Sequence, residues 1–504
     1  MLSHTDRPSH HKFPAIDFLL PTAPSLHRAV TALCSGSMSL RARRLLALVS
    51  LLGLLSGCAR LPQPAPYRGD STRLASTTSA AAAAASEPSV GRRSAPGTPY
   101  TRARPAAQLD SRLLVTTQVA HSDLFFHSPQ NGGPRLLAAQ RLYRGQRAFI
   151  LAFAGNYARD AQNRTDLTYR LVIRKPDGTT DGAPFDGIIW QDAVATDGLV
   201  LFPASTITFW TEPTDPLGDY RFELRVQDHL SGDTIDLAHT AKLIDYAPPV
   251  LAAEFDPNLW FNTYYQNPTP ELALPALGRL FDQLPSDKRQ GALPPILGFY
   301  DQVLTDNTWL LPAFSARLAE AAPDEAYALS IVLGFHLRNA TSAPSGMPET
   351  TWTRLAPFRS SPWPFDPDNT LTLASQFDAL WGRFYASGLY APIGRLLEPL
   401  AFTADLGAAQ RWTAAHPAQA AELNRDNATT DTPPPFDLED PDTPDDIRRE
   451  ILLRTALWSL RANAAQHPLV RGCLDWTLRY GELPADTQTL LSRALAPAPA
   501  PATP

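Results

Sequence analysis

The chain has 504 residues, including 49 prolines and 3 cysteines, and its formal net charge is -6. That length is sufficient for two folded domains, each with a core of its own. The weakly acidic balance supplies no basic surface to collect nucleic acid or anionic lipid, so we expect no nucleic-acid partner.

A basic stretch followed by a short apolar run occupies residues 38–58. Three arginines precede the run from Leu45 to Leu55. The run is too short to cross a bilayer, since a membrane-spanning helix needs about 20 apolar residues. This organisation is typical of an export signal. We expect Met38 to be the true start, and a cytoplasmic extension over residues 1–37 is the alternative.

The apolar run ends in Leu55-Ser56-Gly57-Cys58, which resembles a lipobox, the site where bacteria acylate a cysteine and cleave before it. The resemblance implies that Cys58 carries lipid and that the membrane is a partner through this anchor. Because Ala59 follows, resemblance to lipoprotein sorting in Gram-negative bacteria implies the periplasmic face of the outer membrane. The alternative is a buried core helix with an incidental cysteine.

Residues 59–108 are mostly Ala, Ser, Thr, Pro and Arg, with almost no large apolar side chain. Such a segment cannot bury enough apolar surface to fold, so we expect a disordered tether. A flexible chain of this length spans on the order of 40 Å. Of the cysteines, Cys34 would leave with the signal and Cys58 would carry lipid. Cys473 alone remains, which excludes an internal disulfide framework.

Residues 109–247 have an apolar period of two, which predicts half-buried antiparallel strands. Phe149, Leu151 and Phe153 form the first such run and are expected to face the core. The pattern is clearest from Tyr220 to Val226, where Arg221, Glu223 and Arg225 alternate outward. Turns that contain glycine, most of them with proline, separate the runs. Many short strands with these spacings predict a β-sandwich.

The run from Glu212 to Tyr220 resembles the last hairpin of immunoglobulin-like domains, in which a tyrosine just after the turn fixes the corner. The region is also similar to a β domain of uncharacterised bacterial periplasmic proteins, with an Arg-Lys-Pro-Asp-Gly strand end at Arg174 to Gly178. This resemblance implies an immunoglobulin-like β-sandwich in the cell envelope. It implies no activity, because such sandwiches have unrelated functions.

Residues 250–490 change to a helical period, which predicts an all-α domain. The segment around Leu259-Trp260 resembles the segment around Leu380-Trp381, each followed by an aromatic pair, a proline and Gly-Arg-Leu. This predicts a repeat-like helical domain with a concave binding surface, and chance similarity is the alternative. We expect an acidic, solvated or disordered insertion over 422–446 and a disordered tail over 491–504.

Four groups of side chains suggest sites, and each has a structural alternative. His121 and His127 flank Asp123, but their spacing on one strand face favours loop or surface histidines over a metal site. Trp190 and Trp210 could bind a sugar, although core or rim packing is favoured.

Two further groups lie in the helical domain. Three tryptophans could line a glycan or peptide groove, but packing is the favoured explanation for them. They are Trp352, Trp363 and Trp381. A buried inert thiol is favoured over a thiol hydrolase for Cys473, near Asn463 and His467.

No nucleophile elbow, His-Glu-x-x-His, phosphate-binding glycine loop or Cys-x-x-Cys occurs in the sequence. We therefore expect no enzyme, no catalytic or metal-binding residue and no cofactor, and Cys58 is the one functional residue assigned. The leading hypothesis is a lipid-anchored envelope protein with a non-catalytic protein-binding or scaffold role and an envelope protein as partner. The alternatives are a cell-wall glycan or peptide hydrolase and a carbohydrate-binding lipoprotein.

Overall fold

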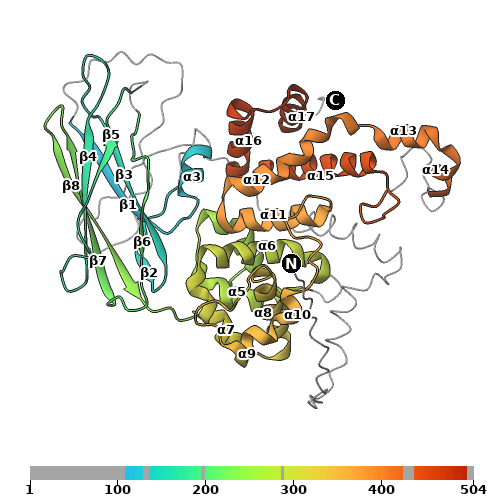
Figure 1. The fold of residues 1–504 in the computed structure, drawn as a ribbon, viewed down its shortest axis with the longest axis horizontal. Coiled ribbons are helices and arrows are strands. Elements are labelled where there is room, and N and C mark those ends of the chain that lie inside the picture. The colour runs from blue at the N-terminus through green and yellow to red at the C-terminus, as the bar shows by residue number, and fades with distance from the viewer. Residues whose placement is uncertain (1–107, 129–134, 195–198, 285–288, 424–435, 497–504) are drawn as a thin grey trace, which may run out of the picture. The chain divides into compact units, whose positions relative to one another are not determined.

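The computed structural model describes residues 108–128, 135–194, 199–284, 289–423 and 436–496, and all of them belong to one compact unit. A β region is followed by a largely helical region (Figure 1), as the sequence predicts at that level. The export signal with Cys58 and nearly all of the expected tether lie outside the described residues, as do the middle of the acidic insertion and residues 497–504.

The β region contains eight described strands in two sheets and one short helix, α3 (His121–His127). The smaller sheet has the order β1-β3-β6, formed by β1 (Asp110–Thr116), β3 (Arg147–Gly155) and β6 (Ile207–Trp210). The larger has the order β2-β8-β7-β4-β5, formed by β2 (Arg141–Tyr143), β4 (Leu167–Arg174), β5 (Phe185–Trp190), β7 (Gly218–Asp228) and β8 (Thr234–Ile244). All strand pairs are antiparallel except β2 with β8.

The two sheets share one apolar core, to which Val115 contributes from the smaller sheet and Leu171 and Phe222 from the larger. On β7 the predicted alternation is confirmed, because Phe222 is fully buried while Arg221 and Arg225 are exposed. Period-two burial therefore places every second side chain of β7 on the outer face of the larger sheet.

Strand β3 differs from its expected orientation. The sequence predicts that Phe149, Leu151 and Phe153 face the core, whereas Ile150 and Ala152 belong to the core cluster. Phe153, on the other face of β3, contacts the rings of Phe125 on α3 and of Phe202. Because β3 is the middle strand of its sheet and is covered on both sides, alternation alone could not identify its inner face.

The helical region begins with short elements and then longer helices. In chain order, the first are α4 (Pro257–Thr263), η1 (Tyr264–Gln266), η2 (Pro270–Leu272), α5 (Ala273–Gln283), α6 (Arg289–Asp306), η3 (Thr308–Leu310), α7 (Leu311–Glu320), α8 (Pro323–His336), α9 (Glu349–Arg354) and α10 (Ala356–Arg359). They are followed by α11 (Ala374–Ser387), α12 (Tyr390–Leu397), η4 (Glu398–Asp405), α13 (Ala408–Ala415), α14 (Pro417–Leu423), α15 (Asp445–Gln466), α16 (Pro468–Tyr480) and α17 (Ala485–Leu495).

Helices α6 and α11 make the closest packing contact of this region. A Cβ atom placed on Gly298 of α6 would lie 2.0 Å from the carbonyl oxygen of Ala379, and one on Gly382 of α11 would lie 2.0 Å from the carbonyl oxygen of Pro295. Each helix therefore places a glycine against the backbone of the other. Side chains as small as alanine would hold the two helices apart.

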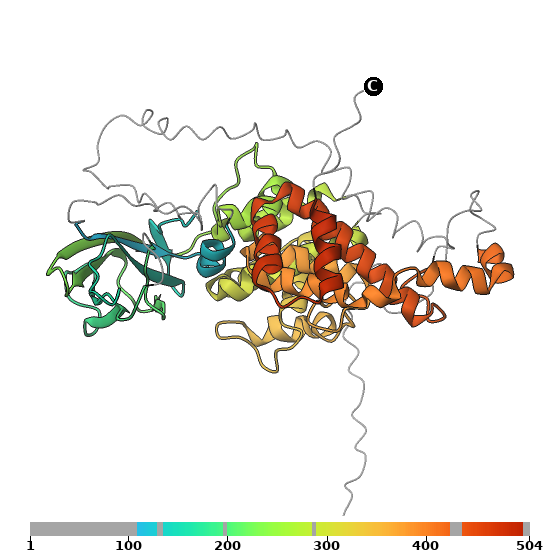
Figure 2. The ribbon, with the colours of Figure 1, turned by 90° about the horizontal axis from the view of Figure 1, so that it is seen from above.

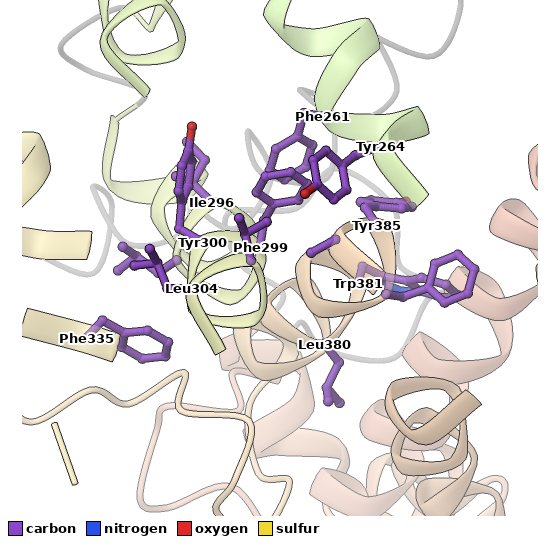
Figure 3. Packing of buried hydrophobic residues seen from close by; sticks show 14 of the residues in the cluster. Phe261, Tyr264, Ile296, Phe299, Tyr300, Leu304, Phe335, Leu380, Trp381 and Tyr385 are labelled. Carbon is purple, nitrogen blue, oxygen red and sulfur yellow. The ribbon is translucent and has the colours of Figure 1, made fainter. Parts of the chain in front are cut away.

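Aromatic side chains fill the core around this helix pair (Figure 3). Phe299 of α6 stacks on Phe261 with ring centroids 4.5 Å apart and meets Tyr264 edge to face at 5.2 Å. On α11, Trp381 and Tyr385 are stacked at 6.1 Å. Rings at these separations add to the stabilisation that burial already provides.

Helix α6 begins at Arg289 and contains the Pro294-Pro295 pair. Two expected boundaries change. Helix α15 begins at Asp445, so the expected acidic insertion ends in a folded segment in which Arg448 donates to carbonyl oxygens. Helix α17 continues to Leu495, which is buried, so the predicted disordered tail cannot begin at residue 491.

The two segments expected to repeat differ in length. The first contains the seven-residue helix α4 and two 3-10 turns before α5, whereas the second begins with the fourteen-residue helix α11. They also differ in burial, because Trp381 is 5% exposed while Trp260 is half-buried.

Helix α3, although it lies in the β part of the sequence, packs against the helical region. It lies beside α16 in both views (Figures 1 and 2). His127 stacks on Tyr390 and meets Trp476 edge to face, each at 5.0 Å. Asp123 accepts a hydrogen bond from the backbone N–H of Tyr390 at 3.1 Å. These contacts fix the position of α3 from its outer side.

A second contact joins the regions through aromatic rings. Tyr143 of β2 stacks on Trp309 at 4.6 Å, and Tyr246 meets the same indole edge to face at 5.1 Å.

Across the described ranges, none of the helices has the length and apolar character that a membrane span requires.

Candidate functional site

Strand β5 forms one edge of the larger sheet. It is hydrogen-bonded to β4 and pairs with no second strand among the described residues. Three of its large apolar side chains are exposed, Phe185 by 49%, Ile188 by 54% and Trp190 by 37%. An edge strand presents unpaired N–H and C=O groups, and natural proteins usually cover or charge such an edge. This edge is a candidate binding surface.

The register of four strands places a row of charges on the outer face of the larger sheet. Asp236 of β8 pairs with Arg225 of β7, Arg225 with Arg170 of β4, and Arg170 with Asp186 of β5. Because directly paired residues point to the same face, the row has the order negative, positive, positive, negative. We call these four residues the charge row.

The charge row is paired at one end more tightly than at the other. Arg225 donates to Asp236 at 2.7 and 3.0 Å, and this hydrogen bond holds the pKa of Asp236 below its usual range. Arg170 and Asp186 are 3.7 Å apart, and both side chains are more than half exposed. Exposed pairs of this kind contribute about 0–1 kcal/mol, so Asp186 can accept a second cation at little cost.

A shallow groove of about 570 Å³ runs along the same face, lined by Ile188, Thr168 and Gln227 besides members of the charge row. The groove reaches β5, where Gly187 lies opposite Tyr169. A Cβ atom on Gly187 would lie 2.5 Å from the tyrosine ring. Glycine at this position therefore leaves space for the ring across the strand pair.

Sequence reasoning singled out Trp190 of β5 for a possible sugar contact, but it did not identify the strand as a protein-binding edge. Its residues, Phe185 to Trp190, include aromatic and β-branched side chains that are typical of strands. That composition could have indicated a strand, but only the sheet order places it at an edge.

The sequence-predicted histidines are not brought together. They lie on helix α3 and not on a strand or loop, and both side chains are buried, so the expectation of loop or surface histidines is wrong. The Nδ1 atom of His127 is 3.5 Å from Asp123, while the ring nitrogens of His121 contact the Gln118 carbonyl oxygen and Thr206. Within the described ranges, no group of three His, Cys, Asp or Glu side chains is placed to hold a metal ion.

The tryptophans divide into two groups. Trp210 is 56% exposed and Trp190 is 37% exposed, so neither lies in the core. Both have contacts that fit the rim alternative, since Arg147 lies over the Trp210 ring at 5.4 Å and the indole N–H of Trp190 donates to the Asp192 carbonyl oxygen. Packing is confirmed in the helical region. The supporting contacts are Arg359 over Trp352, Phe335 against Trp363, and Phe384 against Trp381.

Cys473 is fully buried, which confirms the inert-thiol interpretation, and burial raises the pKa of its thiol far above the usual range. His467 is 7% exposed, and burial lowers its pKa to about 4. Its Nδ1 atom is hydrogen-bonded to the hydroxyl of Tyr265 at 3.2 Å. Asn463 accepts a hydrogen bond from the hydroxyl of Tyr385. His467 and Asn463 therefore have structural partners, and Cys473 belongs to the apolar core.

A buried charge cluster in the helical region was not predicted. Asp301 of α6 contacts Arg383 of α11 at 2.7 Å, His336 of α8 at 3.0 Å and Arg338 at 3.5 Å. Arg338 also binds Asp366 with two hydrogen bonds, at 2.7 and 2.9 Å. Since its members are mutually neutralised, the cluster connects α6, α8 and α11, and we assign it a structural role.

The pKa of Asp301 follows from these contacts. Burial by itself would raise it, but the hydrogen bond from His336 and the charges of Arg383 and Arg338 hold the pKa below its usual range. The carboxylate is thus ionised and fully engaged, unlike a proton donor poised near neutral pH.

No family model matches this sequence, and a search of curated proteins found no relative. Among solved structures, a family 123 glycoside hydrolase from Clostridium perfringens matches with a TM-score of 0.18 and 7% identity over 35% of each chain. An Escherichia coli alpha-2-macroglobulin fragment, from domain MG7 to the C-terminus, matches with a TM-score of 0.16 and 11% identity over 77% of this chain and 62% of that one. This chain thus covers less than two thirds of either structure, and such low scores support no argument about fold or function.

Proposed function

We propose that this protein is a lipid-anchored component of the bacterial cell envelope that binds a partner protein without catalysing a reaction. Cys58 carries the lipid in this proposal, and the folded regions lie on the periplasmic face of the outer membrane. The immunoglobulin-like character of the β region and the repeat-like character of the helical region belong to the same proposal. The observation that carries the binding role is the exposed apolar edge strand β5 beside the charge row.

The partner contributes an extended segment that pairs with β5 as an additional strand. Main-chain hydrogen bonds then supply affinity, and the side chains on one face supply specificity. Because the charge row ends in Asp186, the partner residue opposite it is Lys or Arg. Because Ile188 is exposed on the same face two residues later, the partner residue opposite Ile188 is apolar.

Photocrosslinking in intact envelopes tests this proposal. The lipidated chain carries p-benzoylphenylalanine in place of Ile188, or in place of Arg221 on the central strand β7 as a control. We expect a single protein to crosslink from position 188 only, through an extended segment that contains a basic residue. A segment without a basic residue near the crosslink would contradict the proposed strand addition.

Charge reversal provides the matched comparison. Asp186→Lys places like charge against the partner, so we expect at least a tenfold loss of the crosslink from position 188. Asp236→Lys makes the same change in net charge at the far end of the charge row and should leave the crosslink nearly unchanged. Equal effects of the two reversals would show that net charge, and not pairing along β5, controls the contact.

Metabolic labelling tests the anchor separately. Cells that express the full chain and are fed radiolabelled palmitate should incorporate label into the wild-type protein and none into Cys58→Ala, because the thiol is the acyl acceptor. The wild-type protein should sediment with membranes, and the variant should not. Label that persists in Cys58→Ala would contradict the lipoprotein proposal and would leave the β5 experiment unaffected.

A second candidate function is carbohydrate binding, which the exposure of Trp190 and Trp210 favours. Exposed indoles can stack on sugar rings. Calorimetric titration of the full chain with soluble cell-wall glycan fragments should then give heat that is lost in Trp210→Ala. The hydrolase hypothesis stays without a supporting observation of this kind.

A further inference from the structure

A cavity of about 290 Å³ lies between helix α3 and strand β3, away from the outer face of the larger sheet. Its lining is mostly apolar and includes four phenylalanines, Phe125, Phe126, Phe153 and Phe202. No Lys, Arg, Asp or Glu side chain lines it. Because an unpaired charge is costly to bring into such a place, the cavity favours a neutral ligand.

The phenylalanine rings surround the cavity in two orientations. Phe125 stacks on Phe153 at 5.9 Å and meets Phe202 edge to face at 5.3 Å. A flat aromatic ligand can continue the same stacked and edge-to-face contacts. A cavity of about 150 Å³ holds benzene, so about twice that volume is suited to a molecule with one or two rings.

One polar group in the lining points to a hydroxyl on the ligand. The Nδ1 atom of His121 is 3.1 Å from the carbonyl oxygen of Gln118, which can only accept, so Nδ1 carries the proton. Nε2 is then an acceptor, and its contact with the Thr206 hydroxyl is long, at 3.4 Å. Burial lowers the pKa of His121, which is consistent with a neutral ring.

Helix α3 forms one wall of the cavity, and contacts on its opposite side fix its position. Its opposite side packs on Tyr390 and Trp476 through His127, and Asp123 is hydrogen-bonded to the backbone of Tyr390. The cavity is thus preformed, which reduces the entropic cost of ligand binding.

We propose that this cavity binds a neutral aromatic alcohol of one or two rings, whose rings lie among the four phenylalanines and whose hydroxyl donates to Nε2 of His121. The inference does not depend on the partner-binding proposal, although Tyr169 lines both this cavity and the groove that reaches β5. The chemistry of the lining defines the ligand class, and 2-naphthol and naphthalene serve as probes with and without the hydroxyl.

Equilibrium dialysis of the full chain in lipid nanodiscs, with empty nanodiscs subtracted, measures the binding of both probes. We expect saturable binding of 2-naphthol, about five- to tenfold tighter than that of naphthalene, since one neutral hydrogen bond contributes about 1 kcal/mol. In His121→Phe the ring is kept and the acceptor is lost, so 2-naphthol should bind no more tightly than naphthalene.

Substitution of an exposed alanine by tryptophan tests whether the ligand occupies the cavity, and a second exposed alanine provides the control. Ala204 lines the cavity mouth, so Ala204→Trp should abolish the binding of both probes. Ala253 lies outside the lining, and Ala253→Trp should bind as the wild type does. Because both positions are exposed, both variants should fold, which circular dichroism checks. Absence of saturable binding, binding that survives Ala204→Trp, or equal affinity for the two probes would each overturn the proposal.

Discussion

Replacement of Gly382 by alanine is expected to destabilise the protein by about 3 kcal/mol, the upper end of the usual cost of overpacking a core. The new methyl group would lie 2.0 Å from the Pro295 carbonyl oxygen and 2.8 Å from the Phe299 nitrogen. These are backbone atoms of α6, so no side-chain rotation can relieve the clash. Gly298→Ala should behave similarly, because it meets the backbone of Ala379 at 2.0 Å.

Gly278 of α5 is the matched control, since a Cβ atom there meets nothing within 4 Å. Alanine has the higher helix propensity, so Gly278→Ala should stabilise the protein by about 0.5–1 kcal/mol. Urea denaturation followed by near-ultraviolet circular dichroism measures all three variants. A wild-type midpoint for Gly382→Ala would disprove the close contact between α6 and α11.

Removal of Asp301 is expected to have the second large effect. Asp301→Ala takes away an anion that contacts two guanidinium groups and an imidazole, with side chains only 6–16% exposed on Arg338, His336 and Arg383. Breaking a buried ion pair from one side costs about 3–5 kcal/mol, because the remaining charges stay in a poorly solvated place. Since Asp366 and Asp368 still neutralise part of the positive charge, we expect the lower end of that range.

The exposed ion pair between Arg471 and Asp475 is the control for Asp301. Both side chains are nearly half exposed, so Asp475→Ala should cost less than about 1 kcal/mol. Thermal unfolding at neutral pH compares the two variants. If they are equally stable, the cluster around Asp301 does not hold α6, α8 and α11 together.

The effect of Asp301 should depend on pH in a defined direction. Burial by itself would raise the pKa of Asp301 in the folded protein, but His336, Arg383 and Arg338 together lower it below its usual range. The stabilisation is therefore complete above the unfolded pKa of about 3.9 and is lost as pH falls through the folded value. The difference in stability between wild type and Asp301→Ala should shrink as the pH falls below about 4. An increase of that difference on acidification would contradict the assignment.

Local sequence patterns predicted strands and their buried faces correctly wherever the neighbours of a residue in sequence decide its environment. The alternation from Tyr220 to Val226 identified β7 and its outer face, because one side of that strand is buried and the other is exposed. The same argument misjudged β3, whose two faces are both covered. Helix α3 was missed because seven residues are too few to establish a helical period.

The sequence by itself determined the β and then helical order, the outward side chains of β7 and the burial of Cys473, since each depends on short-range patterning. The lipobox at Cys58 stays a prediction. The tertiary structure alone decided the charge row, whose members Asp186, Arg170, Arg225 and Asp236 come from four strands. It also decided the contact of Gly298 and Gly382 and the phenylalanine-lined cavity. Strand order and helix packing bring these distant residues together, and pairing partners across a sheet or a helix crossing leave no periodic signal in one chain.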